Sequence, residues 1–343
     1  MEFTKIISPR FILICLSAIL VITVLFYIAN YFIGDDASDI PQEIANVNIY
    51  TSTPAASSAT NVPANEIAVL PNFALDRNTP NIANIYKYQK ANSISENQVN
   101  EFNEKFNLSE IYRNDNPDSG LKIVSTSADK HSSLTAEMDK KRITYTNSNI
   151  DHPIFDQGEN VEKYTQFAKE LMKQLEVNDS IFQFESYRYL STKDTNEPQT
   201  ARTDSERNLI ELVYLSKIGE FPIYDKSGEL SPNKFIVWYN SSEVPVKIIY
   251  EPVGIVGEKI GTTNIKDRAK VIEDLNIGKG KLIETSVLNP TKITQTVLQK
   301  GDFGYIGSNG YLIPMFSVSG ISNTYETQYA GQSYFLLGGM ELE

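Results

Sequence analysis

The two histidines come first in a search for chemistry, because histidine is a common general base and metal ligand near neutral pH. His131 and His152 lie in polar, loop-like segments, and neither has the HExxH spacing that puts two imidazoles on one helical face. Asp151 and Asp156 could complete a metal site with His152, but solvated acidic loops are much commoner than ligand sets. We therefore expect no metal ion and no cofactor.

Motifs for nucleophilic or phosphate chemistry are missing or out of context. No G-x-S-x-G turn accompanies either histidine, which disfavours a serine hydrolase. The run Gly278–Gly280 follows a helical pattern instead of joining a strand to a helix, so it indicates a helix end and not a phosphate loop. Asp302–Gly304 matches a kinase tripeptide, but neither a Gly-rich loop nor an H-R-D segment accompanies it.

The 43 Asp and Glu residues leave a carboxylate pair open as a catalytic device. Such a pair could hydrolyse a glycan, but the sequence does not give the separation that this reaction requires. Pairing Glu211 with Glu220, or any similar choice, would be arbitrary. We expect that no residue is catalytic and that the chain is not an enzyme. A glycan hydrolase of the cell envelope is the alternative.

Aromatic side chains suggest binding instead of catalysis. Trp238 and Tyr239 end one predicted strand, and Tyr311 and Phe316 belong to an aromatic-rich C-terminal segment with glycine turns. Clusters of this kind can anchor a peptide or a glycan. Packing inside a sheet is the commoner use of aromatic residues in strands, and this alternative stays open. These four residues are the candidate partner-binding residues.

The elements that must position these residues form three segments, each with a helix followed by strands. The first helix begins with a capping box at Ser95 and Gln98. The second has apolar residues at helical spacing from about Asn160 to Leu175, and the third is capped by Asn264. The expected module boundaries are residues 72–155, 156–258 and 259–343.

Strand patterns surround these helices. Ile82–Tyr88 precedes the first helix, and Leu209–Ile218, Lys234–Tyr239 and Val244–Val253 follow the second. Antiparallel strands that follow a helix can bury one face under it and leave the other open. The expected fold class is α+β, with an N-terminal transmembrane helix, a linker, and then repeated helix-plus-antiparallel-sheet modules.

An uncharged apolar run extends from Phe11 to Ile33, long enough as a helix to cross about 30 Å of hydrocarbon. Lys5 and Arg10 precede it, and three aspartates follow it. The positive-inside rule then leaves residues 1–10 as a cytoplasmic stub and the rest of the chain outside. The run exceeds the core of a signal peptide, so we expect an uncleaved single-pass anchor in the cell membrane.

Residues 34–71 are rich in Ser, Thr, Ala, Pro and Asn, a composition typical of a disordered linker. The rest of the chain has ample apolar side chains for a packed core, since hydrophobic residues make up 41% of the total. The net charge of −12 repels phosphate backbones and disfavours nucleic-acid binding. The single Cys15 lies in the apolar run and excludes an intramolecular disulfide.

Two stretches carry a family resemblance. Asn208–Val253, after its helix, and Asn264–Gly320, with its Gly-Lys-Gly exit, resemble the helix-plus-sheet modules of PepSY-like domains and of the YycH/YycI regulatory proteins. The likeness covers about residues 160–320. It implies a membrane-anchored, extracytoplasmic, non-catalytic protein that regulates a sensor kinase or a protease.

The sequence therefore predicts a single-pass binding or regulatory protein of the bacterial cell envelope. Its own N-terminal helix would hold it in the membrane, and its partner would be an envelope or membrane protein. The alternatives are the glycan hydrolase named above and a structural subunit of an envelope complex. The identity of the partner does not follow from these residues.

Overall fold

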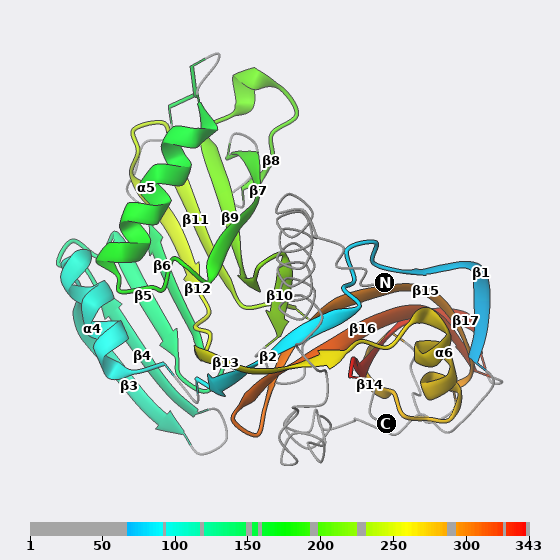
Figure 1. Ribbon diagram of the computed structural model, residues 1–343. Helices are drawn as coiled ribbons and strands as arrows, with labels where there is room; N and C mark the ends of the chain where they lie inside the picture. Colours follow the sequence, from blue (N-terminus) through cyan, green and yellow to red (C-terminus); the bar gives the residue numbers. More distant parts are fainter. Residues whose placement is uncertain are drawn as a thin grey trace, which may run out of the picture.

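The structure, a computed structural model, is dominated by β-strands that form two lobes (Figure 1). Strands make up 56% of it and helices 16%. The residues that it describes are 67–91, 94–116, 120–148, 153–156, 160–192, 198–224, 231–286, 293–324 and 327–340.

The first lobe, which we call the helical lobe, is one antiparallel sheet with two helices on the same face (Figure 1). Its strand order is β3-β4-β5-β6-β12-β11-β9-β7-β8. The elements are α4 (Glu96–Lys105), β3 (Ser109–Asn116), β4 (Gly120–Thr126), β5 (Ser132–Glu137), β6 (Arg142–Asn147), α5 (Val161–Gln174), β7 (Phe182–Ser191), β8 (Gln199–Thr200), β9 (Leu209–Ile218), β11 (Lys234–Asn240) and β12 (Pro245–Tyr250). A short 3-10 helix, η1 (Asp204–Glu206), precedes β9.

This sheet consists of two halves that meet at one pair of strands. The first half is α4 with β3 to β6, and the second half is α5 with β7, β8, β9, β11 and β12. Their last strands, β6 and β12, pair antiparallel, with Tyr145 opposite Ile248 and Thr144 opposite Ile249. The sheet therefore continues without a break from one half into the other.

Both helices begin where the sequence predicts. The Ser95 hydroxyl accepts a hydrogen bond from the Gln98 backbone nitrogen at 3.2 Å, and the Gln98 side chain accepts one from the Ser95 backbone nitrogen at 3.0 Å. This confirms the capping box. The Asn160 side chain caps α5 by accepting from the Glu162 backbone nitrogen at 2.8 Å. These caps depend on local residues alone.

The helix-covered face holds the core of the helical lobe. Phe102 of α4 and Tyr164 of α5 are fully buried, as are Tyr214 of β9 and Phe235 of β11. Phe102 stacks on Tyr250, with ring centroids 6.2 Å apart. Each large apolar side chain buried in this way contributes about 1.5–3 kcal/mol to folding.

The second lobe, which we call the hairpin lobe, is organised around two long strands, β15 and β16. They are joined by a two-residue turn at Asn309 and Gly310, both with positive φ (47° and 84°), which is the geometry of a type I′ hairpin. The lobe consists of β1 (Ile67–Leu75), β2 (Ile82–Gln89), β13 (Ile255–Asn264), α6 (Arg268–Asn276), β14 (Lys281–Thr285), β15 (Ile293–Ser308), β16 (Tyr311–Thr324) and β17 (Thr327–Gly338).

Strands from distant parts of the chain complete this lobe. On the outer side of the hairpin, β1 pairs parallel with β15, and β16 pairs first with β2 and then with β17. β13 lies along β2, and β14 along β17. α6 places Val271 and Leu275 in the core of this lobe.

One short strand connects the two lobes. β10 (Phe221–Tyr224) pairs antiparallel with β9 of the helical lobe and parallel with β15 of the hairpin lobe. Through β10, all seventeen strands of the described residues belong to one connected sheet of mixed parallel and antiparallel pairing.

The predicted fold class is therefore wrong. The strands after α4 and those after α5 share one sheet, where separate modules were expected. The expected third module is a strand-dominated body that also recruits β1 and β2 from before α4. The reason is physical: strand edges that a local pattern leaves unpaired find their partners in distant segments, because buried backbone groups must be hydrogen-bonded.

The predicted membrane helix at residues 11–33 lies outside the described residues, as do residues 1–10 and the expected linker up to residue 66. Among the residues that are described, we find no helix with the length and apolar character needed to span a bilayer. β1 begins at Ile67, so the end of the expected linker, to residue 71, belongs to a strand.

Candidate binding face

Trp238 lies on the face of the helical-lobe sheet that α4 and α5 do not cover, which we call the open face. In β11, Phe235, Val237 and Tyr239 belong to the core beneath the helices. Because side chains alternate along a strand, Ile236 and Trp238 point to the opposite side. Trp238 is the only tryptophan in the chain.

A row of polar side chains crosses the open face at Trp238. The strand register places Glu211 of β9 and Lys247 of β12 on either side of it, and Arg188 of β7 beyond Glu211. The Trp238 indole nitrogen donates a hydrogen bond to Glu211 Oε2 at 2.8 Å. Arg188 donates to both carboxylate oxygens, at 2.6 and 3.1 Å. The Lys247 ammonium lies 4.5 Å from the centroid of the Trp238 ring, a cation–π contact.

The charges of this row are unequally exposed. The Glu211 side chain is only 8% exposed, whereas that of Arg188 is 55% exposed. A buried carboxylate is tolerated when hydrogen bonds and an opposite charge satisfy it, and Glu211 has both. It therefore orients Trp238 and Arg188 on the sheet, with both of its oxygens engaged.

An apolar row runs beside the polar row, two residues further along each strand. Ile249 of β12 lies opposite Ile236 of β11, which lies opposite Val213 of β9. All three side chains are half-buried, as is Leu215, the next residue of β9 on this face. Trp238 itself packs against a small buried cluster formed by Leu190, Leu209 and Val246.

A second polar row borders the apolar row on its other side. Lys234 of β11 lies opposite Leu215. Arg142 of β6 donates to the buried Glu251 carboxylate at 3.0 and 2.8 Å. The apolar side chains of β12, β11 and β9 thus lie between two rows that carry lysine and arginine.

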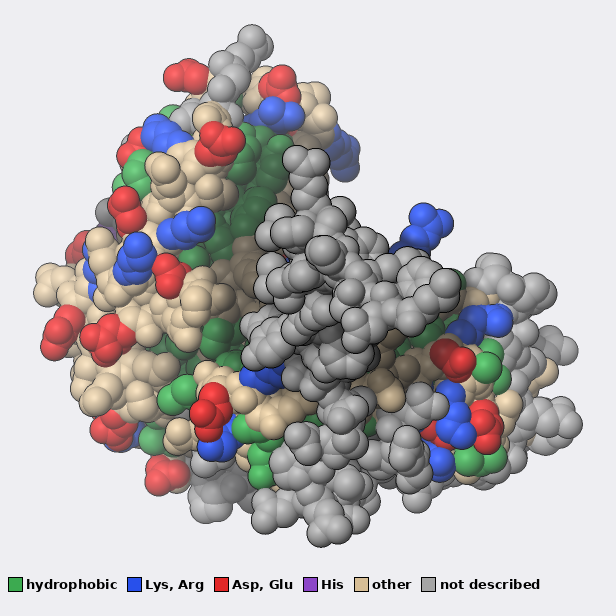
Figure 2. Space-filling view, viewed as in Figure 1, with side chains coloured by type: hydrophobic (Ala, Val, Ile, Leu, Met, Phe, Trp, Pro, Cys, Tyr) green, Lys and Arg blue, Asp and Glu red, His purple; other side chains and the backbone are tan. Residues whose placement is uncertain are grey.

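The open face of the first half has a different composition. The positions that continue the Trp238 row and the apolar row across β6, β5 and β4 are hydroxyl residues, except for Val124 of β4. Thr146 is hydrogen-bonded to Ser133 through their side-chain oxygens at 2.9 Å. These hydroxyl residues are Thr126, Ser133, Thr135, Thr144 and Thr146. In Figure 2, hydrophobic side chains gather on the side of the helical lobe that faces the hairpin lobe.

The structure separates the four aromatic residues that the sequence suggested. Tyr239 is buried beneath α5, beside Tyr164 and Phe167, and burial raises the pKa of its hydroxyl. Phe316 is fully buried in the hairpin lobe against Phe303. Neither reaches the surface, so both lie in the core.

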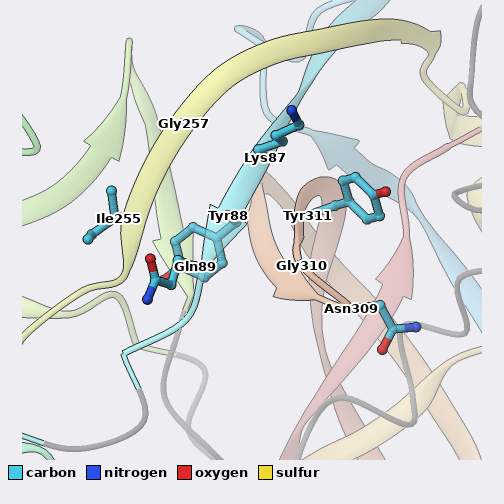
Figure 3. A pocket seen from close by; sticks show the side chains of 8 residues that line it. All are labelled: Lys87, Tyr88, Gln89, Ile255, Gly257, Asn309, Gly310 and Tyr311. Atoms are coloured by element: carbon cyan, nitrogen blue, oxygen red, sulfur yellow. The ribbon is translucent and has the colours of Figure 1, made fainter.

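Tyr311 lines a cavity of about 440 Å³ in the hairpin lobe (Figure 3). The cavity lies between the turn of the long hairpin and the paired strands β2 and β13. Its other lining residues are Lys87, Tyr88, Gln89, Ile255, Gly257, Asn309 and Gly310. The Lys87 ammonium forms an ion pair with Glu258, which raises its pKa. The positive charge of Lys87 at this cavity is therefore already neutralised by Glu258.

Tyr88 connects the elements that surround this cavity. Its hydroxyl accepts a hydrogen bond from the Gly254 backbone nitrogen at 2.9 Å, in the segment that leaves the helical lobe. Its own backbone nitrogen donates to the Gly310 carbonyl at 2.7 Å. A Cβ atom at Gly307 would lie 2.4 Å from the Tyr88 ring, so only glycine allows this close approach.

Of the residues first considered for a metal site, only His131 and Asp156 are among the described residues. His131 is exposed in the turn between β4 and β5, where its backbone nitrogen donates to Asp129 Oδ1 at 3.1 Å. His152 and Asp151 lie outside the described residues. Over the described part of the chain, no group of three or more metal-ligating side chains was found.

Sequence reasoning singled out Trp238 but not its neighbours Arg188 and Lys247, and it left Glu211 without a role. Alternation within each strand could have assigned all four to one face. Their contact depends on the register between β7, β9, β11 and β12, which no local pattern specifies.

Comparisons with known proteins identify no relative for this chain. No family model matches it, and neither a curated protein nor a solved structure shows significant similarity. The resemblance to PepSY-like and YycH/YycI proteins stays a prediction, and the open face around Trp238 must be interpreted from its own chemistry.

Proposed function

We propose that this chain is a non-catalytic binding protein of the cell envelope, anchored by residues 11–33, and that its partner protein occupies the open face of β9, β11 and β12. The observation that carries this proposal is the apolar row Ile249, Ile236 and Val213 with Trp238 beside it. An antiparallel sheet that meets only water usually has polar residues on its outer face.

The first half of the same sheet supports this interpretation. It has a helix on the same side and antiparallel strand pairing, yet its open face carries mostly threonine and serine, with Val124 of β4 as the apolar exception in this row. Apolar side chains on the second half are therefore not a general requirement of this fold. Contiguous apolar patches with a polar rim are typical of protein interaction sites.

Trp238 is suited to the centre of such a site. Tryptophan and arginine are enriched among the residues that dominate binding energy at protein interfaces. Glu211 holds Trp238 and Arg188 in place before a partner arrives, which reduces the entropy that binding must offset.

The proposal can be tested with the full-length chain in native membranes. A photo-crosslinking amino acid is placed at Ile236 and, as the matched control, at Thr135 on the open face of the first half. We expect a discrete crosslinked product from position 236 and none from position 135. The double substitution Val213→Thr and Ile249→Thr should abolish that product.

Equal products from both positions would contradict a localised binding face. Absence of any product from position 236, in a chain that is folded and inserted in the membrane, would refute the proposal. Membrane insertion is checked separately with a reporter fused after the last residue, which should be active only outside the cytoplasm.

A further inference from the structure

We infer that the partner segment on the open face is an amphipathic α-helix whose apolar stripe is flanked by Asp and Glu. This inference rests on the proposed function and specifies the chemistry of the partner. Two observations carry it: each strand beneath the face is paired with a neighbouring strand on both of its edges, and lysine residues border its apolar row.

The backbone pairing favours a helix. β9 is paired with β7 and β11, β11 with β9 and β12, and β12 with β11 and β6. The face therefore offers side chains but no edge to which an extended segment could add. On this face, the backbone N–H and C=O groups of a single extended strand would lose hydrogen bonds to water and gain none in return. A helix forms these hydrogen bonds within itself.

The spacing of the rows suits one helix. Rows two residues apart along a strand are separated by about 6.6 Å, so the two polar rows lie about 13 Å apart. A helix with its side chains is about 10–12 Å across. Its apolar side would rest on Ile249, Ile236 and Val213, with the polar rows along its two flanks.

The charges of the face favour acidic flanks. Lys247 in one polar row and Lys234 in the other form no ion pair with a carboxylate of the described residues. Arg188 neutralises the buried Glu211, and Arg142 the buried Glu251. In a chain of net charge −12, these two lysines therefore lie next to apolar side chains with no carboxylate partner among the described residues. Negative charges on the partner would orient it on this face and increase its rate of association.

The test measures binding of synthetic peptides to the full chain in detergent micelles, with emission of the only tryptophan as the readout. Three tryptophan-free helical peptides are compared. One has a leucine stripe flanked by glutamate, one has the same stripe flanked by lysine, and one has serine in place of leucine between the glutamates.

We expect the glutamate-flanked peptide to change Trp238 emission and to bind about tenfold tighter than the lysine-flanked peptide, an advantage that decreases with salt. In the variant Lys234→Glu with Lys247→Glu, the order of the two peptides should reverse. Lys122→Glu, the same change on the exposed open face of the first half, should leave the order unchanged. Lys247→Gln serves as a milder variant that keeps the test valid if the double variant misfolds.

The two possible failures are distinguishable. If the lysine-flanked peptide binds as well as the glutamate-flanked one, or the glutamate variant does not alter their order, the acidic helix is refuted while the binding face stands. If the serine peptide binds as well as the leucine peptide, or Ile236→Thr has no effect, the apolar face itself is wrong. A crosslink from position 236 to residues 1–66 of the same chain, or to a second copy, would also overturn the inference.

Discussion

The two halves of the helical lobe share one sheet, and they differ on only one of its two faces. Beneath the helices they are alike, because α4 and α5 each bury aromatic and aliphatic side chains against the strands. On the open face they differ: Ile236 and Ile249 of the second half correspond to Thr144 and Thr135 along the same row of the first half. Stability explains the helix-covered face in both halves. It does not explain the apolar residues on the open face of the second half, to which our proposal assigns the partner contact.

The largest effect is expected on the helix-covered face. Leu171 of α5 is 5% exposed within the core of the helical lobe. Leu171→Asp would place an unpaired charge there at a cost of several kcal/mol, against a total stability of roughly 5–15 kcal/mol. We expect unfolding or aggregation, measured by circular dichroism and urea denaturation. Gln166→Asp, at an exposed position of the same helix, is the control and should melt like the parent. Similar melting of both variants would contradict the helix-on-sheet packing.

The second prediction concerns the polar row of the open face. Glu211→Ala removes the acceptor of the Trp238 indole and the partner of Arg188. We expect a loss of about 1–3 kcal/mol in the free energy of unfolding, the usual penalty for leaving a buried donor unsatisfied. Trp238 emission should also report a changed environment.

The matched control for this variant is Glu137→Ala in the first half. Glu137 forms an ion pair with Lys140, whose side chain is 66% exposed, and such surface pairs contribute little. If Glu137→Ala destabilises the chain as much as Glu211→Ala, the buried carboxylate has no special role in positioning Trp238.

The third prediction addresses the helix-covered face between the two halves. Burial, followed by the nearby Glu176 carboxylate, raises the pKa of Glu101 on α4. The Glu101 carboxyl therefore holds its proton more tightly in the folded chain than in the unfolded chain. Its contribution to the free energy of unfolding is present at low pH and is lost as the pH rises through the folded-state pKa.

Glu101→Gln should therefore stabilise the chain at about pH 8 by about 0.5 kcal/mol, the size of a like-charge pair, and have less effect at about pH 4. Urea denaturation at the two pH values measures this difference. Glu220→Gln, at an exposed position between β9 and β10 and away from Glu101, is the control. A larger stabilisation by Glu101→Gln at about pH 4 than at about pH 8 would contradict a raised pKa for Glu101.

The smallest effect on folding is expected from making the two open faces alike. Thr135→Ile together with Thr144→Ile extends the apolar row into the first half, at half-buried positions. The melting temperature should change little, since surface substitutions usually alter stability by about 0.5 kcal/mol or less. The enlarged apolar patch should instead increase self-association, measured by sedimentation velocity. Unchanged or lower self-association would show that the contrast between the open faces has no bearing on association.

The sequence by itself determined the features that depend on a few neighbouring residues. Ser95 with Gln98 and Asn160 specify where α4 and α5 begin, because each cap is a contact between residues two or three apart. Alternation along β11 likewise indicates that Trp238 and Tyr239 point to opposite faces.

Tertiary structure decided which strands became neighbours and therefore which side chains meet. β2 precedes α4 in the chain but pairs with β13 and β16 in the other lobe, and β6 pairs with β12 about a hundred residues later (Figure 1). Arg188, Glu211, Trp238 and Lys247 come from four strands and meet only because the register aligns them. A slip of one residue would send every side chain of a strand to the other face. The free energy gained by burying the whole sheet selects one register over the alternatives. That free energy depends on many strands together, so no short stretch of sequence specifies the register.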